Sequence, residues 1–134
     1  MINDIFHHIQ AHLSLLEMSL ESSSKIKAYA TMNDLDQVIN ETENRERLVN
    51  IIGQIQSGIE RKIQALGPQD LQEDSLDILR SWFQDLAIWS EKMIENDKET
   101  VELLNQQKDD TTKEIATIFK NKESIKGYNH TVKK

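Results

Sequence analysis

The feature of this sequence that most constrains its fold is a stripe between residues 35 and 66. The steps between its members alternate three and four without a slip, which is the heptad pattern of a helix that coils gently against its neighbours. The stripe consists of Leu35, Val38, Thr42, Arg45, Val49, Ile52, Gln56, Ile59, Ile63 and Leu66. It predicts one long helix over residues 34–66. Asn33 or Asp34 is the expected N-cap, and Gly67 the expected left-handed residue after the helix.

Some stripe positions hold polar residues, among them Thr42, Arg45 and Gln56. Polar side chains at such positions fix the alignment of packed helices at some loss of stability. We interpret Thr42, Arg45 and Gln56 as polar layers. Asp97, which lies on a similar stripe later in the chain, is expected to form a polar layer or a helix cap.

Two further stretches show a helical repeat of apolar residues. The first predicts a helix over about residues 4–31, with Asn3 or Asp4 as N-cap. The second runs over residues 71–126. Its capping-box patterns, which begin at Asn96 and Thr111, mark two alternative positions for a break that would give a fourth helix.

Composition agrees with long helices, because the chain has one proline, four glycines and 29% charged residues. The predicted fold is therefore all-α. We expect an elongated antiparallel bundle of three long helices, the third either continuous or broken to give a fourth. One domain covers residues 1–126, and residues 127–134 form a flexible basic tail.

The third helix is too long for its neighbours. At 1.5 Å per residue the first two helices span about 42 and 50 Å, whereas residues 71–126 reach about 84 Å. Either this stretch folds back, or its C-terminal third lacks cover within the chain. Apolar residues without cover indicate a partner.

No pattern of residues predicts catalysis. The chain has no cysteine, and His8 and His12 lack a third ligand, so both are expected to be boundary or surface residues rather than a metal site. Trp82, Phe83 and Trp89 have the spacing of core aromatics. We therefore expect no enzyme activity, no metal and no cofactor.

Charge is unevenly spread along the chain. The net charge is −7, but residues 111–134 hold six lysines and two glutamates and carry +4, which leaves −11 on the rest. An acidic body disfavours binding to nucleic acid. Without a long apolar run or a signal-peptide pattern, the protein is expected to be soluble and cytoplasmic, with no insertion into a membrane.

Two stretches resemble a known family, the flagellar type III export chaperones of the FliT/FlgN class, and the likeness is to the FliT-like members above all. The stretch "AYATMNDLDQVINETENRERLV" has a short acidic junction before a helix with Glu43, Arg45 and Arg47. The stretch "MIENDKETVELLNQQKDDTTKEIATIFKNKESIKGY" is similar to the end of FliT-like chains, with spaced leucines, a lysine-rich turn and a final Tyr128. The tryptophan often found at the acidic junction of that family is missing here.

The resemblance implies a cytoplasmic helical chaperone without catalysis. Such a protein binds and shields the helical terminal segment of a filament-cap or hook-associated protein and delivers it to the type III export apparatus. A partner helix requires an apolar face at helical spacing. The residues expected to bind it are Val101, Leu104, Ile115, Ile118, Phe119, Ile125 and Tyr128.

Two alternatives remain open at this point. The first concerns a candidate second contact surface for the export machinery, formed by Glu43, Arg45 and Arg47. In the other interpretation, Arg45 sets the register of the helices and its charged neighbours are solvated. The alternative to an export chaperone is a self-associating structural coiled-coil or bundle protein, in which the same apolar face pairs with another copy as a homodimer.

Overall fold

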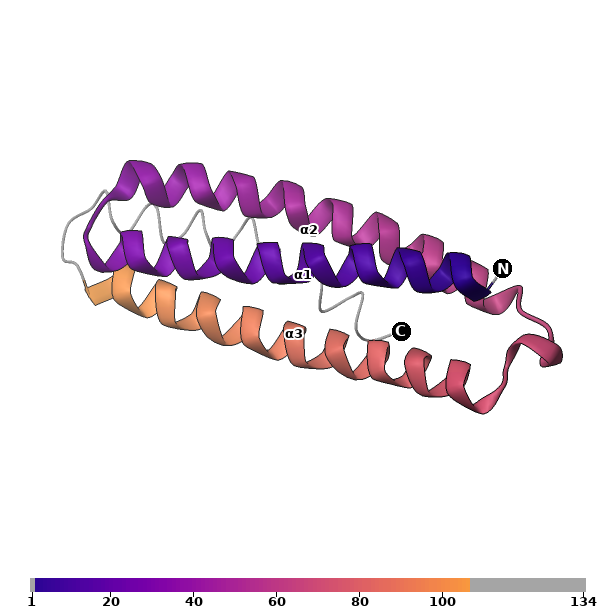
Figure 1. The fold of residues 1–134 in the computed structure, drawn as a ribbon. Coiled ribbons are helices and arrows are strands. Elements are labelled where there is room, and N and C mark those ends of the chain that lie inside the picture. The colour runs from indigo at the N-terminus through magenta and orange to yellow at the C-terminus, as the bar shows by residue number, and fades with distance from the viewer. Residues whose placement is uncertain (1, 107–134) are drawn as a thin grey trace.

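The computed structural model of the chain describes residues 2–106 and shows an all-helical bundle (Figure 1). Three long helices form it, which confirms the predicted fold class. Its elements in chain order are α1 (Ile2–Thr31), α2 (Leu35–Gln64), the short 3₁₀ helix η1 (Pro68–Asp70) and α3 (Glu73–Gln106).

Helix α1 is the central helix of the bundle, and both α2 and α3 pack along it (Figure 1). Backbone contacts between α2 and α3 are few by comparison. A tight turn joins α1 to α2 at one end, and η1 lies in the longer connection from α2 to α3 at the other end. The last turn of α3 therefore comes to lie near the turn between α1 and α2 (Figure 1).

The turn between α1 and α2 follows from its sequence. Asp34 caps α2 as predicted, because its carboxylate accepts a hydrogen bond of 3.3 Å from the backbone N–H of Gln37. Asn33 takes up the left-handed conformation with φ 57°, which asparagine tolerates better than most residues.

Two predictions about helix ends are wrong. Asn3 and Asp4 are not N-caps, because α1 already begins at Ile2 and Asp4 lies in its first turn, where a negative charge is favourable. Gly67 is not left-handed, since it has φ −90° and ψ 169°. The extended backbone of Gly67 leads into η1. The backbone N–H of Gly67 donates a hydrogen bond of 3.1 Å to the carboxylate of Asp70.

Helix α3 is continuous through Asn96, so of the two alternative positions for a break the one at Asn96 does not occur. The carboxylate of the next residue, Asp97, faces inward and binds Arg45 of α2. Helix α3 continues past Asn96 and Asp97. The other expected break, at Thr111, lies outside the described residues.

The interior formed by residues 2–106 contains two apolar clusters. The main cluster fills the half of the bundle near η1 and includes Trp82 and Trp89, as predicted, whereas Phe83 is half exposed and lies against Trp82. Its buried members are Ile5, Ile9, Leu16, Val49, Ile52, Ile59, Leu79, Trp82, Leu86, Trp89 and Met93. The smaller cluster, which we call the end cluster, lies beside the turn between α1 and α2. It contains Ile26, Ala30, Val38, Val101 and Leu104.

The polar layers expected on the stripes are buried. Thr42, Arg45, Gln56 and Asp97 all lie in the interior. Arg45 of α2 forms an ion pair with Asp97 of α3, and both side chains are only 2% exposed. This pair lies between the two apolar clusters and ties together two helices that contact each other little.

Removing one member of the ion pair tests its structural role. Arg45→Ala leaves the carboxylate of Asp97 buried beside a cavity, so the free energy of unfolding should fall by about 3–5 kcal/mol in urea titrations. The matched control is Arg47→Ala on the exposed face of α2, where the change should stay within about 0.5 kcal/mol. Equal effects of the two substitutions would contradict this role.

Candidate partner-binding surface

The described part of the predicted binding face is not open. Leu104 is fully buried and Val101 is 8% exposed, because α1 and α2 cover both in the end cluster. The expectation of an uncovered face is therefore wrong for Val101 and Leu104. The end of α3 lies beside the turn between α1 and α2 and does not project past it (Figure 1), so the end cluster covers both residues. The other expected residues, Ile115, Ile118, Phe119, Ile125 and Tyr128, lie outside the described residues.

The candidate second surface is divided by the fold. Glu43 and Arg47 are exposed on α2, but Arg45 points into the bundle and is buried. Arg45 is therefore not available to a partner in this structure. The buried position of Arg45 agrees with a residue that sets the register of the helices, and not with a contact surface.

A different apolar surface follows the outer side of the α1–α2 pair. Positions 4, 8, 11, 15, 18 and 22 lie along one line of α1, and positions 41, 44, 48, 51, 55, 58 and 62 along one line of α2. The two lines meet at both ends. Lys62 Nζ lies 2.7 Å from Asp4 Oδ2, and Ser22 Oγ donates to Glu41 Oε2 at 2.6 Å.

Between these two polar contacts, the paired lines hold mainly apolar side chains. We call this surface the apolar seam; its members are Ala11, Leu15, Met18, Leu48, Ile51 and Ile55. Leu15 and Ile55 also pack on the main cluster from outside. Met18 is 49% exposed and Ile51 is 44% exposed, so the seam is accessible apolar surface along two parallel ridges.

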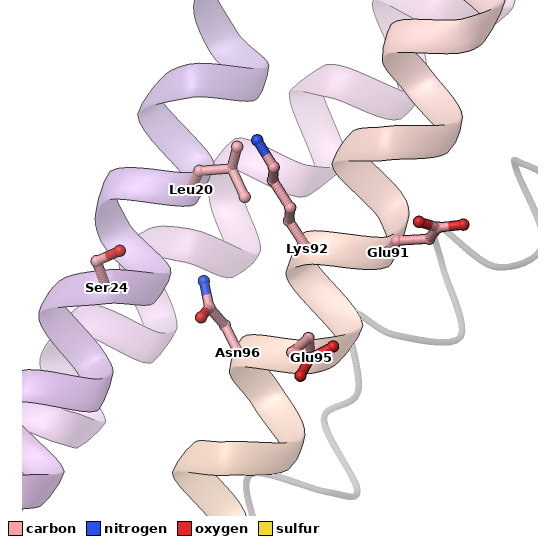
Figure 2. A pocket seen from close by; sticks show the side chains of 6 residues that line it. All are labelled: Leu20, Ser24, Glu91, Lys92, Glu95 and Asn96. Atoms are coloured by element: carbon pink, nitrogen blue, oxygen red, sulfur yellow. The ribbon is translucent and has the colours of Figure 1, made fainter.

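The opposite flank of α1 is polar by contrast. A depression of about 450 Å³ lies between α1 and α3, lined by Leu20, Ser24, Glu91, Lys92, Glu95 and Asn96. Figure 2 shows Lys92 and Asn96 extending toward α1 and the two glutamates pointing away from it. Farther along this flank, Lys27 forms an ion pair with Glu99. Exposed ion pairs of this kind contribute little to stability, and such a polar flank offers a partner helix little apolar surface to bury.

The prediction that His12 is a boundary or surface residue is wrong, because His12 is fully buried. Its Nδ1 accepts a hydrogen bond of 3.1 Å from Trp82 Nε1, and the two rings meet edge to face with centroids 5.5 Å apart. Burial lowers the pKa of His12 to about 4, and the backbone carbonyl of Ile52 acts weakly in the opposite direction. The imidazole is therefore neutral at pH 7 and has a structural role.

The described residues hold no group of three side chains suited to a metal ion. Within residues 2–106, no helix combines the length and the apolar character that crossing a bilayer requires. The described surface thus carries the apolar seam on α1 and α2, and single apolar side chains are exposed on α3 at Ile78, Phe83 and Ile88.

Sequence reasoning missed the apolar seam, although a signal for it was present. Leu15, Met18, Leu48, Ile51 and Ile55 lie beside the buried stripes of their helices at helical spacing. The stripes alone do not show which flank of α1 receives α2. Only the pairing of Asp4 with Lys62 and of Ser22 with Glu41 places the two sets of residues side by side.

The burial of Leu104 predicts a loss of stability on truncation. Leu104→Ala should lower the free energy of unfolding by about 2–5 kcal/mol in urea titrations, because it opens a cavity in the end cluster. The control is Leu71→Ala at a site 39% exposed in the connection to α3, where the loss should stay below about 1 kcal/mol. A Leu104 variant of unchanged stability would show that this residue is not core.

The buried neutral His12 predicts a loss of stability in acid. Its pKa in the folded chain, about 4, lies below the ordinary value of 6.5, so between these pH values the unfolded chain binds a proton that the folded chain does not. From pH 7 to pH 5 this difference lowers the free energy of unfolding by about 2 kcal/mol. His12→Asn should remove that part of the pH dependence in urea titrations. An identical pH dependence in both proteins would contradict it.

No protein-family model, curated protein or solved structure matches this chain. The apolar seam and the architecture that forms it therefore carry the functional argument.

Proposed function

We propose that the chain is a cytoplasmic flagellar type III export chaperone. It binds and shields the helical terminal segment of a filament-cap or hook-associated protein and delivers that segment to the export apparatus. The resemblance of residues 28–49 and 93–128 to FliT-like chains supports this class of function. The single structural observation that supports it most is the apolar seam on α1 and α2.

The dimensions of the seam suit a short amphipathic helix. Residues 11–18 of α1 and 48–55 of α2 each span about 10 Å at 1.5 Å per residue, which is about two turns. A helix lying along the seam buries side chains at positions i, i+3, i+4 and i+7 between the two ridges. The exported segment is thereby kept from aggregating through the same side chains.

The negative charge of the chain favours partner segments that are basic. The stretch that precedes residue 111 carries −11, so it repels acidic proteins and attracts basic segments over a distance of about one Debye length. Exposed Glu43 and Arg47 on α2 lie away from the buried stripe and remain available for a second contact, with the export machinery.

The proposal is tested by measuring binding of filament-cap and hook-associated terminal segments to the full chain by calorimetry. A dissociation constant in the micromolar range or tighter is expected for at least one of them. Absence of binding by every segment at about 100 μM would overturn the proposal.

A pair of matched substitutions locates the surface. Ile51→Asp places a charge in the centre of the apolar seam and should weaken binding of the segment by at least about tenfold, with little change in stability because the site is 44% exposed. Ile88→Asp is the control, since Ile88 is 50% exposed on α3 and lies off the seam. Equal affinities of the two variants would show that the segment binds elsewhere.

The same variants separate the chaperone from a self-associating bundle protein. If the apolar seam pairs two copies of the chain, light scattering will show a stable dimer that Ile51→Asp dissociates and Ile88→Asp does not. A dimer of this kind that has no affinity for the exported segments would favour the structural alternative.

A further inference from the structure

A layer of polar side chains crosses the bundle between its two apolar clusters. Every helix contributes to it: Ser23 from α1, Arg45 from α2 and Asp97 from α3. We call these three residues the polar layer. All are buried to 2% exposure or less. The main cluster lies on one side of this layer and the end cluster on the other.

Arg45 connects the three helices through one guanidinium group. It donates to Ser23 Oγ at 3.2 Å and, through its second terminal nitrogen, to Asp97 Oδ2 at 3.1 Å. Ser23 in turn donates to the sulfur of Met93 at 3.2 Å. The layer is thus a hydrogen-bonded cross-section rather than an isolated pair.

Such a layer specifies alignment more than it adds stability. Taking two charges out of water costs free energy that their attraction roughly repays, and well-packed apolar residues at the same positions are often more stabilising. Among residues 2–106, the layer also separates five buried apolar residues in the end cluster from eleven in the main cluster. The smaller group has less burial to hold it closed, and local opening begins in such regions.

The contacts of the end cluster indicate which element leaves first. The turn between α1 and α2 is held by the Asp34 cap, and these two helices pack closely. Helix α3 as a whole has few backbone contacts with α2. Its last turns are held by the apolar packing of the end cluster and by the half-exposed Lys27–Glu99 ion pair with α1. An ion pair of that exposure contributes little to stability.

We propose that the polar layer divides the bundle into two units that open separately. In the smaller unit the turns of α3 that follow Asp97 swing away from α1 and α2. Val101 and Leu104 then lose the cover of Ile26, Ala30 and Val38 and become accessible. The binding step rests on the proposed function. In that step the exported helix binds to the uncovered residues of the end cluster, which form a second binding place that includes Val101 and Leu104 of α3.

Hydrogen exchange of the full chain, followed by mass spectrometry, tests the division without any partner. Amides of residues 98–104 should exchange at least about tenfold faster than amides of residues 82–93 in the same helix. Similar protection along the whole of α3 would overturn the proposal.

A double substitution tests the role of the polar layer itself. In Arg45→Met with Asp97→Leu, apolar side chains join the two clusters, and protection of residues 98–104 should rise by about tenfold or more toward that of residues 82–93. The matched control is Arg80→Met with Asp77→Leu, which removes an exposed ion pair on α3 and should leave both segments unchanged. A rise in both double variants, or in neither, would overturn the role of the layer. If the first double variant does not fold, the exchange pattern of the unaltered chain still decides whether the bundle opens as two units.

Binding measurements keep this proposal distinct from the proposed function. If exported segments bind through the opened end cluster, the Arg45→Met with Asp97→Leu variant should bind them at least about tenfold more weakly, while Arg80→Met with Asp77→Leu binds normally. Equal affinities of the Arg45→Met with Asp97→Leu variant and the unaltered chain would show that the end cluster is not a binding place. A chain that binds no segment but shows the two-unit exchange pattern would refute the export function alone.

Discussion

The ion pair between Arg45 and Asp97 fixes how α2 and α3 lie relative to each other. These helices share few backbone contacts, so their alignment depends on side chains that meet across the interior. A shift of α3 along its axis would separate two buried opposite charges, which costs several kcal/mol. Few alternative arrangements avoid that cost, and the stripes of both helices are therefore held in one register. The polar layer around the pair also sets where the main cluster ends and the end cluster begins.

The central position of α1 decides what the surface offers. Because α2 and α3 both pack on α1, the bundle has two outer flanks on that helix. On the α3 flank the residues are charged, and the Lys27–Glu99 pair closes one part of it. The α2 flank carries the apolar seam between two polar contacts. A surface that is apolar in the middle and polar at both ends suits a short helix of defined length, which is the physical basis of the proposed chaperone role.

The sequence predicted the stripes well because heptad spacing depends only on helical geometry. Val38, Val49, Ile52 and Ile59 are buried as their spacing indicates, and so is Arg45. His12 was misjudged because its burial depends on Trp82, which lies 70 residues away. Gly67 was misjudged because a helix can end without a left-handed residue when a 3₁₀ turn follows.

The candidate site was harder to predict than the fold. Val101 and Leu104 have the spacing expected of either a core face or a docking face, and nothing local distinguishes the two. Their burial depends on where α3 ends up relative to the turn between α1 and α2. The apolar seam depends in the same way on which flank of α1 receives α2.

By itself, the sequence determined the all-α fold class, the buried face of each helix and the presence of polar layers, because all three follow from periodicity along one chain. Only the tertiary structure decided that Arg45 meets Asp97, that Val101 and Leu104 are covered, and that Met18 and Ile51 share an exposed seam. These facts depend on the lateral arrangement of helices. That arrangement is set by contacts between residues far apart in the chain, which a local repeat does not specify.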